Sequence, residues 1–386
     1  MIYTIYPNFD ATIYERFPDK NTGTDSILEL VHEATPSGSI YNSRILIKFD
    51  VDGIREEIQN GKISNNADYY LSLKTSGIYE IPQEYTIYAF PASSSWANGT
   101  GTYKNFPNVT DGVSWKYRFS KQSDIQWEVP PLTTAYEWDD ITETWIESTF
   151  TFGTLMADVS SSYYTNVGGG NWWIYDNIEC TQSFSFQSSD VYMDVGQIVR
   201  KWITGSGRIQ NDGFLIKYSD EHESSNYSLS GLQFYSADSN TIYVPRLYVV
   251  WDDSEFNTGS LLPANIENTN INVKLKKYYS EKERTKIRIF ANEKYPRRQY
   301  TTQSYYTRNF FLPESSYYEI RDAHTDEVFI PFDDIGTKIS CDSTGSYFNI
   351  WMDNFQPERF YRIVLKIVDN DEQHYLDNSF YFKVTR

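Results

Sequence analysis

The sequence predicts an all-β protein, and three observations support this prediction. The 386 residues include 33 Tyr, 23 Phe and 10 Trp but only 4 Met, and aromatic side chains fit the half-buried surface of a sheet. Short runs of β-forming residues recur along the chain and alternate with Asn, Asp and Gly turns. A polar segment separates two β-rich blocks, and a chain of this length can supply each with a core of its own.

The first block opens with three expected strands and a short helix. The strands cover residues 10–15, 27–30 and 44–49, and an Asn-Thr-Gly turn lies between the first two. The helix is expected between Gly53 and Asn60, because Ile54 and Ile58 are four residues apart and so share one face.

A second helix is expected after Asp194, which is placed as its N-cap. Its apolar residues recur at the helical period and form one face: Val195, Ile198, Val199 and Trp202. Trp202 is therefore expected in the core. An Asn-Asp-Gly turn at residues 211–213 then leads into a strand over 214–218, and a last strand covers 246–251.

This order of elements resembles the DNRLRE-type domain, a jelly-roll-like β-sandwich related to some carbohydrate-binding modules. The resemblance rests on the strand that ends in Lys48-Phe49-Asp50, on the helix after Asp194 and on the strand that follows Gly213. Trp96 and Trp115 are similar to the paired Trp elements of the family.

The resemblance covers residues 8–251 and implies a jelly-roll-like β-sandwich over residues 1–253. Residues 125–189 are more than this family needs, so we expect an expansion there that carries contacts peculiar to this protein. Residues 254–268 combine Gly, Ser, Asn and Pro, and we expect a linker. Residues 269–386 contain several short alternating strands, which suggest an immunoglobulin-like β-sandwich.

Charge is distributed unevenly along the chain. Residues 1–250 carry 16 Lys and Arg against 31 Asp and Glu, whereas residues 274–298 carry ten basic residues against three Glu. One interpretation of the basic segment is a solvated strand face, and the other is a docking surface for an acidic partner, which could be another copy of the N-terminal part. The residues expected on such a surface are Lys274, Lys276, Lys282, Arg284, Lys286, Arg288, Arg297 and Arg298.

A short aromatic run raises the question of sugar binding, because pyranose rings stack on aromatic faces while their hydroxyl groups need polar partners. Asn171, Trp172, Trp173 and Tyr175 offer this combination. Adjacent residues on a strand point to opposite faces, so one of the two tryptophans is expected to be exposed, where it could contact a glycan or a protein. The alternative is that these residues pack in the core.

The sequence offers little for catalysis, and we expect neither an enzyme nor a cofactor. The four histidines occur singly, and no zinc motif, nucleophile elbow or phosphate loop is present. Carboxylates are abundant, so a glycosidase pair is not excluded by counting. The acidic pair Asp50 and Asp52 and the acidic cluster Asp369, Asp371 and Glu372 are compatible with a structural calcium ion or with exposed turns. Cys180 and Cys341 are expected to be buried free thiols.

Two function classes remain. The net charge of −18 argues against nucleic acid and anionic membranes as partners, and no apolar run is long enough to span a bilayer. The two β-sandwiches and the N-terminus without a visible secretion signal resemble tailed-phage virion structural proteins of the tail, neck, baseplate or capsid decoration. Such a protein would assemble in the host cytoplasm with other virion proteins and copies of itself. The alternative is an extracellular carbohydrate-binding or adhesin module that binds glycans.

Overall fold

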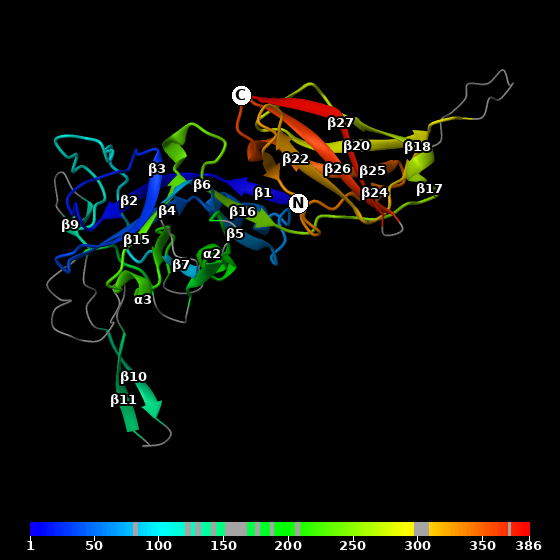
Figure 1. Cartoon of the computed structure of the whole chain (residues 1–386). Coiled ribbons are helices and arrows are strands. Elements are labelled where there is room, and N and C mark those ends of the chain that lie inside the picture. The colour runs from blue at the N-terminus through cyan, green and yellow to red at the C-terminus, as the bar shows by residue number, and fades with distance from the viewer. Residues whose placement is uncertain are drawn as a thin grey trace. The chain divides into compact units, whose positions relative to one another are not determined.

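The computed structural model describes residues 1–79, 84–119, 125–127, 133–139, 144–150, 168–173, 178–185, 189–204, 209–296, 309–369 and 372–386. The chain divides into two compact units. The larger unit comprises Ile5–Lys62 and Tyr69–Tyr248, and the smaller unit comprises Met1–Thr4, Ile63–Asp68 and Val249–Arg386. Strands dominate both units, which confirms the all-β prediction (Figure 1). The expected domain limits stay predictions.

An antiparallel eight-stranded sheet forms the body of the larger unit. Its order is β12-β7-β14-β4-β3-β15-β6, and β2 pairs with β4 beside this path. The strands are β2 (Pro7–Tyr14), β3 (Ile27–Ala34), β4 (Ile40–Phe49), β6 (Thr75–Ile78), β7 (Glu84–Pro91), β12 (Cys180–Ser185), β14 (Phe214–Tyr218) and β15 (Leu229–Tyr235). The strands expected from residues 10, 27, 44 and 214 onward are β2, β3, β4 and β14.

A second sheet has the order β1-β16-β5-β13. Its strands are β1 (Ile2–Ile5), β5 (Asp68–Leu73), β13 (Val191–Asp194) and β16 (Arg246–Val250). In β13, Val191 and Met193 are buried while Tyr192 and Asp194 are exposed, which is the alternation of a strand with one covered face. Three of the four limits between the units fall inside β1, β5 and β16, and the fourth lies between Lys62 and Ile63.

Helices are short throughout the described residues. They are α1 (Asp52–Gln59), α2 (Gly196–Thr204) and α3 (Asp220–Glu223), with single 3-10 turns at Ala237–Ser239, Ile266–Asn268 and Met352–Asn354. The two longer helices confirm the helical patterns in the sequence. The Asp194 carboxylate accepts a hydrogen bond from the Gly196 N–H at 2.8 Å, and Trp202 is buried as expected.

The Asn-Asp-Gly turn before β14 depends on glycine. Gly213 has a φ of +92°, and a Cβ atom there would lie 2.5 Å from the Ile47 carbonyl oxygen. The Asn211 side chain accepts a hydrogen bond from the Gly213 N–H at 3.2 Å and donates one to the Phe49 carbonyl at 2.7 Å. The turn therefore ties the start of β14 to the neighbouring β4.

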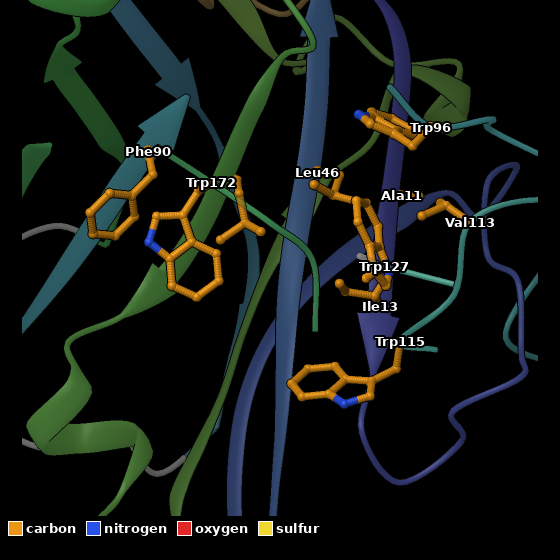
Figure 2. Close-up of a cluster of buried hydrophobic side chains, with 10 residues drawn as sticks. Ala11, Ile13, Leu46, Phe90, Trp96, Val113, Trp115, Trp127 and Trp172 are labelled. Carbon is orange, nitrogen blue, oxygen red and sulfur yellow. The ribbon is translucent and has the colours of Figure 1, made fainter. Parts of the chain in front are cut away.

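A tryptophan-rich cluster fills part of the core of the larger unit (Figure 2). Strands β2, β4, β7 and β14 contribute Phe90 and most of its aliphatic residues, while segments outside the strands contribute Val113 and the tryptophans. The members are Ala11, Ile13, Leu46, Phe90, Trp96, Val113, Trp115, Trp127, Trp172 and Leu215. The buried indoles of Trp96 and Trp127 each donate a hydrogen bond of 2.9 Å to a backbone carbonyl, so their polar atoms are satisfied.

Two small sheets accompany the larger unit. Strands β8 (Tyr117–Phe119) and β9 (Ile125–Gln126) form one of them, and β10 (Thr133–Asp139) and β11 (Thr144–Phe150) form the other. In the second, every residue of β10 has an antiparallel partner in β11, from Thr133 opposite Phe150 to Asp139 opposite Thr144. Figure 1 draws this hairpin as a ribbon of its own.

The smaller unit is a β-sandwich of two sheets. One has the order β17-β21-β20-β25-β24 with β18 paired to β20, and the other has the order β19-β27-β26-β22-β23. The strands are β17 (Leu262–Pro263), β18 (Thr269–Lys274), β19 (Tyr278–Ser280), β20 (Arg284–Glu293), β21 (Asn309–Phe311), β22 (Ser316–Asp322), β23 (Val328–Ile330), β24 (Ser340–Asp342), β25 (Gly345–Trp351), β26 (Phe360–Asp369) and β27 (Glu372–Thr385). Tyr318 of β22 stacks on Phe348 of β25, with ring centroids 4.1 Å apart, so the two sheets share one core.

Candidate functional site

The aromatic run that the sequence suggested for glycan contacts lies largely in the core. Trp172 is 1% exposed and Asn171 is 3% exposed. Trp172 packs beside Phe90, with ring centroids 5.7 Å apart (Figure 2), and it forms a β-bridge with Ala92. Burial removes Trp172 and Asn171 from the candidate sugar contacts, because a pyranose ring cannot reach them. Trp173 is half-buried, and Tyr175 lies outside the described residues.

The glycines before this run bring the backbone against a buried arginine. Gly169 and Gly170 have φ values of +85° and +87°, which favour glycine. The Gly169 carbonyl accepts a hydrogen bond from Arg44 Nη1 at 2.7 Å, and a Cβ on Gly169 would lie 2.5 Å from the same nitrogen. These glycines therefore let the backbone approach Arg44 closely.

Arg44 belongs to a buried group of charges and rings, here called the cation–aromatic cluster, made of Arg44, Trp115, Trp172, Lys217 and Glu223. Arg44 of β4 forms a two-point salt bridge with Glu223 of α3, at 3.0 Å from Nε to Oε1 and 2.8 Å from Nη2 to Oε2. Lys217 of β14 donates to Glu223 Oε2 at 2.7 Å. Lys217 is 1% exposed, so this ion pair offsets part of the cost of removing its ammonium group from water.

The same cations lie over aromatic rings. The Arg44 guanidinium carbon lies 4.9 Å from the Trp115 ring centroid and 5.1 Å from that of Trp172. Lys217 Nζ lies 5.3 Å from the Trp172 centroid. Both cations thus gain cation–π attraction in addition to the ion pairs.

The electrostatics of the cluster favour an ionised Glu223. Burial disfavours the charged carboxylate, but Arg44 and Lys217 outweigh this effect and lower the pKa of Glu223. Lys217 also contacts Asp220, which lies at the surface. Each charge in the cluster has a partner and is closed to solvent, so the arrangement holds β4, β14, α3 and the 168–173 run together.

The sequence patterns did not single out Arg44, Lys217 or Glu223. The available signal was a cation inside each of two β-forming runs, Arg44 before Ile45 and Lys217 after Ile216. A charge at a buried strand position requires a buried partner. Glu223, which lies 179 residues after Arg44, could not be identified from that signal.

The basic segment lies on one sheet of the smaller unit. In β20, Ile287 and Ile289 are buried, while Arg284, Lys286 and Arg288 occupy the alternate positions on the outer face. Lys274 of β18 pairs directly with Arg288 in the register. We call Lys274, Lys282, Arg284, Lys286 and Arg288 the basic surface.

Part of this charge is engaged locally. Arg288 Nη1 lies 2.6 Å from Asp342 Oδ1, and this hydrogen bond is the main cause that lowers the pKa of Asp342 to about 2. Lys286 Nζ lies 3.7 Å from the Tyr347 ring centroid, and the Arg284 guanidinium carbon lies 3.8 Å from that of Trp351.

The remaining basic residues fall into three groups. Lys276 forms an ion pair with Glu283, so it contributes little net charge to its surroundings. Lys274 and Lys282 are exposed. Arg297 and Arg298 lie outside the described residues.

The acidic turn at Asp50 forms contacts within the chain. Asp50 Oδ1 accepts a hydrogen bond from the Asp52 N–H at 2.9 Å, and Asp52 pairs with Arg55 at 2.9 Å. Within the described part of the chain, no group of three or more His, Cys, Asp or Glu side chains is arranged to hold a metal ion. A structural calcium ion stays a sequence-based expectation.

The two cysteines are free and buried, as expected. Burial is the main cause that raises the pKa of the Cys180 thiol to about 12, so the reactive thiolate is scarce at neutral pH. In the described ranges, no helix combines the length and apolar character that a membrane crossing would require.

Comparisons with known proteins identify no family. No family model matches the sequence, and no curated protein matches it. Among solved structures, the chain is similar to the tripod from the baseplate of bacteriophage Tuc2009, at 8% identity over 100% of this chain and 97% of that chain, with a TM-score of 0.13. A likeness at this TM-score carries no argument about fold or function.

Proposed function

We propose that this chain is a non-catalytic structural protein that acts through protein–protein contacts of its β-rich units. One observation carries the proposal: the buried charges Arg44, Lys217 and Glu223 satisfy one another away from solvent, whereas the basic surface is exposed to partners. Charged groups that serve catalysis must reach a substrate, and these three do not. Surface charge of one sign instead favours association with a partner of opposite charge.

The finer proposal is a place in the virion of a tailed bacteriophage, assembled in the host cytoplasm with other virion proteins. The resemblance of the sequence to phage structural proteins supports it, as does an architecture of sheets with short helices. The alternative is an extracellular glycan-binding module, for which Trp173 is the described aromatic residue of the original run that is not fully buried.

Light scattering of the purified protein over a range of concentrations tests the proposal. We expect a mass that rises with concentration to multiples of 45.1 kDa. A glycan array run on the same preparation tests the alternative, with Trp173→Ala as the control for ring stacking. A protein that stays monomeric and binds glycans through Trp173 would contradict the proposal.

A further inference from the structure

The segment that contains the β10–β11 hairpin carries much of the net negative charge of the chain, because it lacks basic residues. Residues 122–199 contain twelve Asp and Glu and neither Lys nor Arg. Within the hairpin strands, the acidic residues are Glu137, Asp139 and Glu147. Their register partners are Ile146, Thr144 and Tyr136, and none of these is a basic residue.

The backbone of the hairpin is also available for pairing with another chain. The two strands form a sheet of their own, and neither pairs with another described strand. An isolated two-stranded hairpin is marginally stable in water. Among the described residues no further strand pairs with its outer edges, and an open strand edge is a usual place for another chain to bind. A partner would therefore stabilise this element.

The basic surface of the smaller unit has the complementary charge. The five cations lie at the end of β18, along the first half of β20 and on the turn between β19 and β20, and Asp342 pairs with two of them. The surface consequently keeps an excess of positive charge. An acidic hairpin and a basic strand face attract each other over about one Debye length, roughly 8–10 Å at physiological salt.

We propose that the β10–β11 hairpin of one copy docks on the basic surface of a second copy of this chain. The inference rests on the proposed structural function and names its partner. The contact joins two different surfaces, so it is heterologous, and it builds rings or open filaments rather than closed pairs. We infer a second copy as the partner because the chain carries both the acidic hairpin and the basic surface.

Charge reversal on the full chain tests the contact. Glu137→Lys with Glu147→Lys reverses the hairpin, and Lys274→Glu with Lys282→Glu reverses exposed positions of the basic surface while leaving the Arg288–Asp342 pair intact. Each double variant places like charges against each other and should weaken self-association at least about tenfold. A control with Lys62→Glu and Lys104→Glu makes the same net change as the second variant on other loops and should associate like the parent protein.

Mixing the two double variants provides the decisive measurement, by light scattering and analytical ultracentrifugation. Each reversed surface then meets its opposite in the other protein, so association should return, and the association of the parent protein should weaken as NaCl rises from about 0.05 to about 0.5 M. If the parent protein associates but all variants behave alike, the docking inference is wrong while the structural function survives. If the parent protein is a monomer at every concentration, both are wrong.

Discussion

Replacing Glu223 by Gln should destabilise the larger unit more than any other single charge removal in the cation–aromatic cluster. The substitution removes the negative charge from three contacts, at 3.0, 2.8 and 2.7 Å, and leaves Arg44 and Lys217 as two buried cations. Removing one partner of a buried ion pair costs about 3–5 kcal/mol. For a unit of this size, that cost lowers Tm by about 6 to 20 °C, at roughly 2–4 °C per kcal/mol.

Urea unfolding followed by tryptophan fluorescence measures this cost, because Trp115 and Trp172 lie within 6 Å of the Arg44 guanidinium. Glu221→Gln is the matched control: the same helix and the same chemical change at an exposed position, with an effect of at most about 0.5 kcal/mol. In a Lys217→Met background, Glu223→Gln should cost less, since one buried cation is gone. A loss below about 1 kcal/mol for Glu223→Gln would refute the assigned role of the carboxylate.

Three further predictions concern single positions. Trp172→Ala should cost about 3–5 kcal/mol in urea unfolding, and a loss under about 1 kcal/mol would mean that its indole is not core. Burial raises the pKa of Asp10 from 3.8 to about 6, so its stabilising effect is complete below pH 4 and disappears as pH rises past 6. The difference in unfolding free energy between the parent protein and Asp10→Asn should therefore fall by about 3 kcal/mol as the pH rises across this range. A difference that does not change with pH would contradict the prediction. Gly213→Ala should destabilise by about 1–3 kcal/mol, whereas Gly53→Ala, where a Cβ meets nothing within 4 Å, should be neutral or stabilising.

Much of the larger unit could be predicted because its elements depend on local patterns. The spacing of Ile198, Val199 and Trp202 predicted the helix α2, and the Asn-Asp-Gly turn predicted where β14 begins. These features need no knowledge of distant residues, since a helix face and a turn are defined within a few positions.

The site could be predicted only in part because burial is decided by distant partners. Alternation indicates that Trp172 and Trp173 point to opposite faces, but Phe90 and Arg44 decide which face is the core. The basic segment allowed a solvated strand face as one interpretation, while Asp342, which lies 54 residues after Arg288, decides how much of that charge is neutralised. Contacts between residues so far apart in sequence depend on the whole fold, so a short stretch of sequence cannot predict them.

The core holds both ends of the segment between Trp127 and Gly168. Trp127 donates a hydrogen bond from its indole to the Ser114 carbonyl, and Trp172 forms a bridge with Ala92 in the same tryptophan cluster. When both ends of a loop are held by the same core, each doubling of the loop length raises the free energy of loop closure by only about 0.6 kcal/mol. A change of length between Trp127 and Gly168 should therefore leave the stability of this core largely unchanged.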